Sequence, residues 1–110
     1  MKVTLLGTGT SVGVPQIGCH CRVCTSSDPR DRRLRCSALV QAKGTNILID
    51  CGPDFREQML RIGFEERLDG VLVTHEHYDH VGGIDDLRPF SYLHNLPLYA
   101  DEYAITHLRQ

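Results

Sequence analysis

A six-residue segment, His75–His80, gathers three imidazoles and a carboxylate directly after a short apolar run. In an extended turn, side chains two residues apart project to the same side, so His75 and His77 can share one metal ion. Asp79 and His80 can face a second ion as the chain curls into a helix. The spacing therefore predicts a site for two divalent metal ions, either zinc or manganese, at the end of a strand.

Two neighbouring divalent ions suit hydrolysis, because they activate water at neutral pH and hold both the attacking and the leaving oxygen. Asp79 is the candidate catalytic residue, since its carboxylate can also orient the attacking water. Glu76 and Tyr78 alternate with the ligands, and we expect them to be solvent-facing or structural. A polar loop of solvated histidines is the alternative, and the density of ligands argues against it.

The pattern His-x-His-x-Asp-His resembles the signature of the metallo-β-lactamase superfamily. The resemblance extends to Gly82-Gly83, where glycine lets the backbone pass close to the site. It implies an αββα sandwich, and it assigns a role to Asp50 at the end of a predicted strand. An aspartate lies beneath the metal loop in the superfamily, so we expect Asp50 to steady that loop by hydrogen bonding. Without the resemblance, Asp50 is equally well explained as a turn residue.

Three cysteines, Cys19, Cys21 and Cys24, lie within six residues of a segment that otherwise predicts irregular backbone. In a reducing compartment, crowded thiols bind metal more often than they form disulfides. A structural zinc ion is the natural inference, and a tetrahedral site needs a fourth ligand. The candidates for that ligand are His20, Cys36, Cys51 and a residue beyond the end of the chain. Three free thiols in a surface loop are the alternative.

The cysteine cluster makes the resemblance more specific, to one group of enzymes within the superfamily. With the segments 7–11 (GTGTS) and 52–56 (GPDFR), it makes the chain similar to the cyclic-phosphate phosphodiesterases of the phosphonate-degradation, or carbon-phosphorus lyase, pathway. That resemblance implies a small phosphoester substrate, and a structural zinc held by the three cysteines and a histidine from the C-terminal part. Family members are longer and take further ligands from that part. We therefore expect residues 1–110 to be the N-terminal half of a hydrolase domain that is inactive alone, with residues 19–36 as a zinc-binding insertion.

The periodicity of the chain predicts a mixed α/β fold. Apolar runs predict strands at 2–6, 37–42, 46–50, 71–74 and 96–100. A short glycine-containing turn at 43–45 joins the second and third strands in a hairpin, so the sheet is not purely parallel. A helix is expected from Gly52-Pro53 to Gly63, and Asp101 is expected to cap a last helix.

Composition limits the remaining classes of function. Fourteen acidic and 12 basic side chains give a formal charge of −2, which leaves no overall field to attract a polyanion. No apolar run approaches the ~20 residues of a membrane helix, and no signal peptide follows Met1, so we expect a cytoplasmic protein without membrane contact.

Two other functions remain open. A transfer-RNA 3′-processing endonuclease of the same superfamily would contact phosphates through Arg30, Arg32, Arg33 and Arg35, although a nucleic-acid substrate is not favoured. A non-catalytic module would use zinc only to fold.

The expected half sandwich has consequences for packing. One sheet face lacks its partner, so we expect Leu39, Ile47, Ile49 and Leu72 to be uncovered and the chain to form a homodimer. We expect Cys51 to be a buried free thiol.

Overall fold

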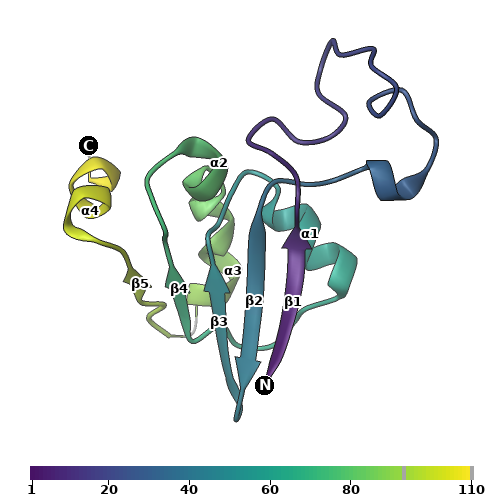
Figure 1. Ribbon diagram of the computed structural model, residues 1–110. Coiled ribbons are helices and arrows are strands. Elements are labelled where there is room, and N and C mark those ends of the chain that lie inside the picture. Colours follow the sequence, from purple (N-terminus) through teal and green to yellow (C-terminus); the bar gives the residue numbers. More distant parts are fainter. Residues whose placement is uncertain (93, 110) are drawn as a thin grey trace.

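The structure, a computed structural model, describes residues 1–92 and 94–109. Its backbone is a five-stranded sheet with the order β1-β2-β3-β4-β5 (Figure 1). The strands are β1 (Lys2–Gly7), β2 (Ser37–Ala42), β3 (Thr45–Ile49), β4 (Gly70–Leu72) and β5 (Leu98–Tyr99). Strands β1, β2 and β3 pair antiparallel, whereas β3, β4 and β5 pair parallel. The prediction of a mixed sheet is confirmed.

The β2–β3 hairpin turns at Lys43 and Gly44, whose φ angles are 50° and 77°. Two successive residues with positive φ are typical of the type I′ turn, whose twist matches that of the strands it joins. The turn pairs Ala42 with Thr45, and this register places Ala38 opposite Ile49. Asp50 therefore emerges at the edge of the sheet where β3 ends.

Four α-helices and two short 3₁₀ turns connect and cover the strands. They are η1 (Pro29–Asp31), α1 (Phe55–Ile62), α2 (Tyr78–Val81), η2 (Ile84–Leu87), α3 (Arg88–Ser91) and α4 (Glu102–Leu108). Helix α1 stops at Gly63 with φ 66°, and the Asp101 side chain caps α4 by accepting from the Ala104 amide at 2.8 Å, both as predicted. None of the helices in the described part of the chain has the length and hydropathy needed to cross a bilayer.

The cysteine-rich segment is mostly irregular, as expected, but η1 interrupts it. Asp28 accepts a hydrogen bond from the amide of Arg30 at 2.9 Å, and Pro29 occupies the first position of the turn. An aspartate followed by proline is a favoured start for a helical turn, so the expectation of irregular backbone in this segment was wrong at η1.

The hydrophobic core lies between one face of the sheet and the helices α1 and α3, which Figure 1 shows on the same side of the strands. Leu39, Leu48 and Val71 are neighbours across β2, β3 and β4, and all three are fully buried. Phe55 at the start of α1 packs edge-on against Phe90 of α3. This packing fixes the strands whose ends carry the candidate site.

The opposite face of the sheet is apolar and largely bare. Leu5 and Leu72 are 68% and 41% exposed, and Ile47 and Ile49 are half-buried. The prediction for Leu72 is confirmed, but the prediction for Leu39 was wrong. Leu39 is only 1% exposed, because side chains alternate along a strand and its register with Leu48 directs it toward the helices.

The bare face leads to a prediction about association. We expect the purified 110-residue chain to sediment as a homodimer or a larger species, because burying Leu5, Leu72 and their neighbours removes apolar surface from water. A double substitution, Leu5→Lys with Leu72→Lys, should shift the chain to monomer, whereas Leu60→Lys on exposed helix α1 should not. A wild-type monomer that unfolds cooperatively at all concentrations would contradict this expectation.

Candidate metal centre

The predicted site residues meet at one edge of the sheet, because β3 and β4 are parallel and end side by side (Figure 1). Asp50 follows β3, while Thr74 and His75 follow β4. The Asp50 amide donates to the carbonyl of Leu72 at 2.8 Å, and the residue has a φ of 63°. Strand β4 is shorter than predicted, because the Thr74 amide bonds to the side chain of Asp50 instead of to a neighbouring strand.

The Asp50 carboxylate is buried and accepts hydrogen bonds at both oxygens. Its Oδ1 accepts from the Thr74 amide, and its Oδ2 accepts from the Thr74 hydroxyl, each at 2.7 Å. The same Oδ2 lies 2.6 Å from Nδ1 of His80. The side chain is only 5% exposed, so these three partners replace the water that a carboxylate requires.

These contacts define the tautomers of two histidines. Because the Thr74 hydroxyl gives its proton to Asp50, it must accept one from Nδ1 of His75, which lies 2.9 Å away. His80 likewise donates from Nδ1 to Asp50. Both rings therefore keep Nε2 free as a lone-pair donor, the form in which a neutral histidine binds metal.

The positions of Asp79 and His80 indicate whether a cation can bind between their side chains. Nε2 of His80 lies 3.0 Å from Oδ2 of Asp79, and both side chains are mostly buried. With its proton on Nδ1, His80 turns a lone pair toward a carboxylate lone pair, an arrangement that repels unless a cation or proton lies between them. The donor set, one imidazole nitrogen and one carboxylate oxygen, fits Zn²⁺ or Mn²⁺.

The three imidazoles form a cluster around His75. Its ring centroid lies 4.7 Å from that of His77 and 4.1 Å from that of His80. The structure thus brings the predicted ligands close together, with His75 nearer to His80 than to His77, and His77 is the most exposed of the three imidazoles at 69%.

The backbone of the metal loop, which comprises the histidine motif and the glycines after it (residues 75–83), packs directly on residues 50–52. The Cys51 amide donates to the carbonyl of His80 at 2.9 Å, and the Gly83 amide donates to the carbonyl of Cys51 at 3.0 Å. A Cβ on Gly83 would overlap the carbonyl oxygen of Gly52, and one on Gly52 would overlap that of Asp79. The prediction of close backbone approach is confirmed for Gly83, whereas a Cβ on Gly82 would meet the ring of Tyr78.

The sulfur atoms of Cys19, Cys21 and Cys24 all lie within 4.8 Å of one another. Amides of Cys24 and Gln16 point at Sγ of Cys21 and Cys24, at 3.4 and 3.5 Å. The Cys24 amide and the Cys19 side chain lower the pKa of Cys21 to about 7, which favours the thiolate that metals bind. Over residues 1–92 and 94–109, no other set of three metal-binding side chains is this compact.

Cys51 is a buried free thiol, as predicted. Burial raises its pKa to about 12, with the charges of Asp86 and Asp50 adding to the effect. Cys36 is free and exposed. Neither joins the cysteine cluster, which among the described residues offers three of the four ligands that a tetrahedral zinc site would need.

Sequence reasoning missed Thr74, which orients His75 and contacts Asp50 in the structure. Its hydroxyl, directly before the first histidine, was the available signal.

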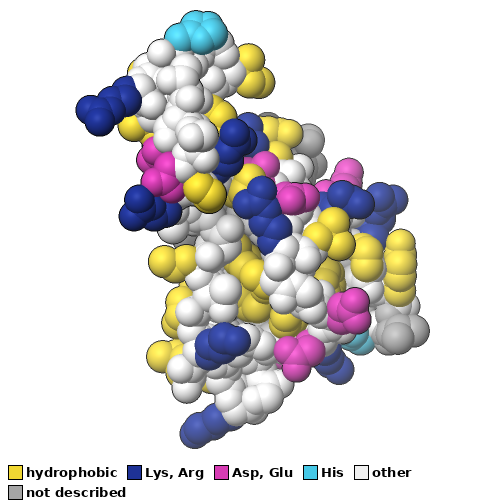
Figure 2. Space-filling model, turned by 90° about the vertical axis from the view of Figure 1, so that its right-hand side faces the viewer, with side chains coloured by type: hydrophobic (Ala, Val, Ile, Leu, Met, Phe, Trp, Pro, Cys, Tyr) yellow, Lys and Arg dark blue, Asp and Glu magenta, His cyan; other side chains and the backbone are white. Residues whose placement is uncertain are grey.

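The arginine segment is partly neutralised, because Arg30 pairs with Asp28 at 2.7 Å and Arg35 pairs with Asp54 at 3.0 Å. On the face of the molecule that Figure 2 shows, Lys and Arg side chains are interspersed with Asp and Glu side chains.

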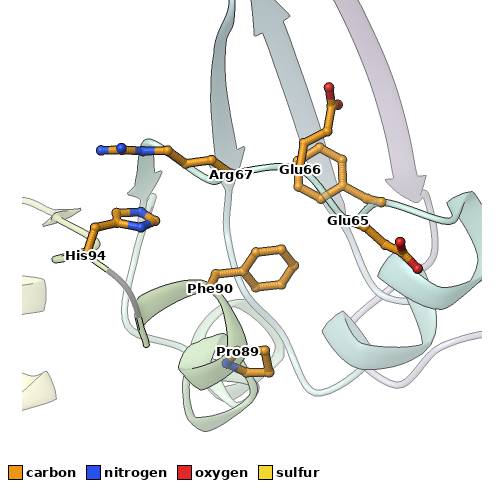
Figure 3. Close-up of a pocket in the computed structure, with 7 residues that line it drawn as sticks. Glu65, Glu66, Arg67, Pro89, Phe90 and His94 are labelled. Carbon is orange, nitrogen blue, oxygen red and sulfur yellow. The ribbon is translucent and has the colours of Figure 1, made fainter.

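A cavity of about 600 Å³ lies apart from the metal loop, and none of its lining residues belongs to 75–80. Phe90 forms one wall, with Arg67 and His94 at its rim (Figure 3). The Nε2 atom of His94 lies 3.1 Å from the carbonyl of Leu68, so this histidine has a structural role here.

The packing of Gly83 predicts the effect of one added methyl group. Gly83→Ala should destabilise the fold by about 2 kcal/mol or more and weaken metal binding at the histidines, because the loop must move away from Gly52. The matched control is Gly44→Ala, which meets open space and has only the cost of a positive φ, about 1 kcal/mol. Equal denaturant midpoints for the two variants would contradict this account.

Comparison with known sequences identifies the family of the chain. Residues 45–110 match the family described as the Beta-lactamase superfamily domain. The chain is 53% identical over 110 residues to a Porphyromonas gingivalis protein named octanoyltransferase, but spans 22% of that protein. It is also 47% identical over 64 residues to ribonuclease Z of Bradyrhizobium diazoefficiens, covering 57% of this chain and 21% of that enzyme. The names of the relatives therefore differ.

Solved structures give the same family. A new diphosphatase from the PhnP family superposes with a TM-score of 0.93 at 52% identity, covering 97% of this chain and 44% of that one. Zn²⁺-bound PqqB from Methylobacterium extorquens follows with a TM-score of 0.85 at 28% identity, covering 99% of this chain and 40% of that one. As expected, the chain corresponds to part of longer proteins. It belongs to the metallo-β-lactamase superfamily, whose members are metal-dependent hydrolases.

Proposed function

We propose that this chain supplies one half of a binuclear metal centre that hydrolyses phosphoester or phosphoanhydride bonds. His75 and His77 would hold one divalent ion, and Asp79 and His80 would hold the second. The observation that carries the proposal is the 3.0 Å approach of His80 Nε2 to Asp79 Oδ2, while Nδ1 is committed to Asp50. A cation or a proton must lie between two lone pairs held so close, and a nitrogen and a carboxylate oxygen in this position are the ligands that a divalent ion uses.

Each residue at the site has a distinct task in this proposal. When bound, a pair of divalent ions supplies activated water and stabilises negative charge on phosphoryl oxygens. Asp50 holds His80 in place, and Thr74 holds His75. Asp79, with 17% of its side chain exposed, orients the attacking water beside the substrate.

The other half of the domain would complete the centre. The bare face of the sheet and the 44% coverage of the solved diphosphatase support residues 1–110 as the first half of a hydrolase domain. Remaining ligands and the leaving-group acid would then come from the second half. On this proposal the 110-residue chain lacks turnover by itself.

The cysteine cluster is proposed to hold a structural zinc within the insertion 19–36. Three converging sulfur atoms and amides directed at two of them support this. The fourth ligand would come from outside the described residues. All five cysteines are free, which is consistent with a reducing compartment such as the cytoplasm.

The substrate is proposed to be a small molecule with a phosphoester or diphosphate group. The solved relative at 52% identity is described as a diphosphatase, which supports this choice. Ribonuclease Z among the relatives keeps transfer RNA as the alternative. That alternative has less support, because Arg30 and Arg35 already pair with carboxylates of this chain, and phosphate contacts need free basic groups.

Removal of Asp79 tests the proposed hydrolysis. In the full gene product that carries this chain, Asp79→Ala should lower kcat/KM toward a phosphodiester or a dinucleoside diphosphate by at least about 100-fold. Replacement of the exposed Asp85 by Ala serves as the control and should leave it unchanged. Wild-type rates in Asp79→Ala would show that the reaction does not use this site, and a wild type that hydrolyses neither substrate would favour a non-catalytic zinc module. Cleavage of precursor transfer RNA alone would favour the endonuclease.

Zinc titration separates the two proposed metal sites. We expect one tighter site that depends on the cysteines and weaker binding at the histidines, because each ion at the histidine loop has only two ligands from this chain. Cys24→Ser should remove the tight site, whereas Cys51→Ser should not, since Cys51 is buried outside the cluster. Equally tight binding at both sites, or loss of zinc in Cys51→Ser, would contradict the assignment.

A further inference from the structure

The three imidazoles of the metal loop differ in how their second ring nitrogen is held. His75 uses Nδ1 to donate to Thr74, and His80 uses Nδ1 to donate to Asp50. Nε2 of His77 instead lies 3.9 Å from Oε1 of the neighbouring Glu76, which is beyond hydrogen-bond distance. Metal-binding histidines nearly always donate their second ring N–H to an oxygen, so His77 lacks the contact that its two neighbours have.

Of the two expectations for Glu76, solvent-facing or structural, the structure favours the second. Its side chain is only 20% exposed, compared with 69% for His77. Over residues 1–92 and 94–109, its carboxylate accepts no side-chain or backbone hydrogen bond. Its oxygens are not among the buried polar atoms that lack a partner, so the carboxylate is an available acceptor for Nε2 of His77, which lies 3.9 Å from Oε1.

We propose that Glu76 is a positioning residue that accepts a hydrogen bond from Nε2–H of His77 and so directs Nδ1 to the metal. This rests on the proposed metal centre. A separation of 3.9 Å is too long for a hydrogen bond, but the exposed His77 ring is free to swing toward the carboxylate. A cation at Nδ1 draws electron density from the ring and strengthens the Nε2–H donor. Glu76 thus does for His77 what Asp50 does for His80.

Binding of Mn²⁺ to the 110-residue chain tests the proposal, measured from the electron paramagnetic resonance signal of the free ion. Mn²⁺ prefers nitrogen and oxygen ligands to thiolates, so it reports the histidine loop and not the cysteine cluster. Glu76→Ala should weaken Mn²⁺ binding by about 10- to 100-fold. Glu76→Gln should recover part of this loss, because its amide oxygen still accepts from Nε2–H. The exposed Glu102→Ala serves as the control and should bind like the wild type.

A second readout needs no metal. Nitrogen-15 NMR of the metal-free chain should show the Nε2–H tautomer of His77 favoured in the wild type and in Glu76→Gln, and reduced in Glu76→Ala. Wild-type affinity and an unchanged tautomer in Glu76→Ala would overturn the proposal, as would a Glu76→Gln variant no better than Glu76→Ala. If the wild type binds no Mn²⁺, the proposed metal centre fails, while the NMR result still decides the role of Glu76.

Discussion

The buried carboxylate of Asp50 is the interaction on which the rest of the site depends. It sits between the ends of two parallel strands and accepts from the amide and hydroxyl of Thr74 and from Nδ1 of His80. Removing one of these three donors would leave a charge that is 95% buried only partly compensated, which is unfavourable. The same contacts set the tautomers of His75 and His80. One residue thus links the sheet, the loop and the direction in which the ligands point.

The loop needs a second constraint, which the backbone supplies. Gly52 and Gly83 allow the chain after β3 to touch the chain after the histidines, and two amide hydrogen bonds close the contact. The core beneath, with Leu48 and Val71 on adjacent strands, keeps those strand ends in register. Ligand geometry therefore depends on packing several residues away. Sites that are held this way lose little free energy to reorganisation when a metal binds.

Much of this arrangement could be predicted because it follows local rules. The ligand spacing in 75–80, the positive φ at Gly63 and the Asp101 cap each depend on a few neighbouring residues. Leu39 was assigned to the wrong face because the direction of a side chain depends on strand register, which an apolar run does not reveal. Thr74 and Glu76 escaped notice because their roles depend on which side chains lie opposite them. Tertiary contacts decide such roles.

The central claim is that Asp50 holds His80 so that its Nε2 and the Asp79 carboxylate bind one metal ion. A crystal structure of the protein with Mn²⁺, with the ion located by anomalous scattering, tests this most directly. The account predicts an ion about 2.0–2.3 Å from both His80 Nε2 and Asp79 Oδ2, with Asp50 still accepting from Nδ1 of His80. An ion bound through Nδ1 of His80, or none at this pair while others bind elsewhere, would contradict it.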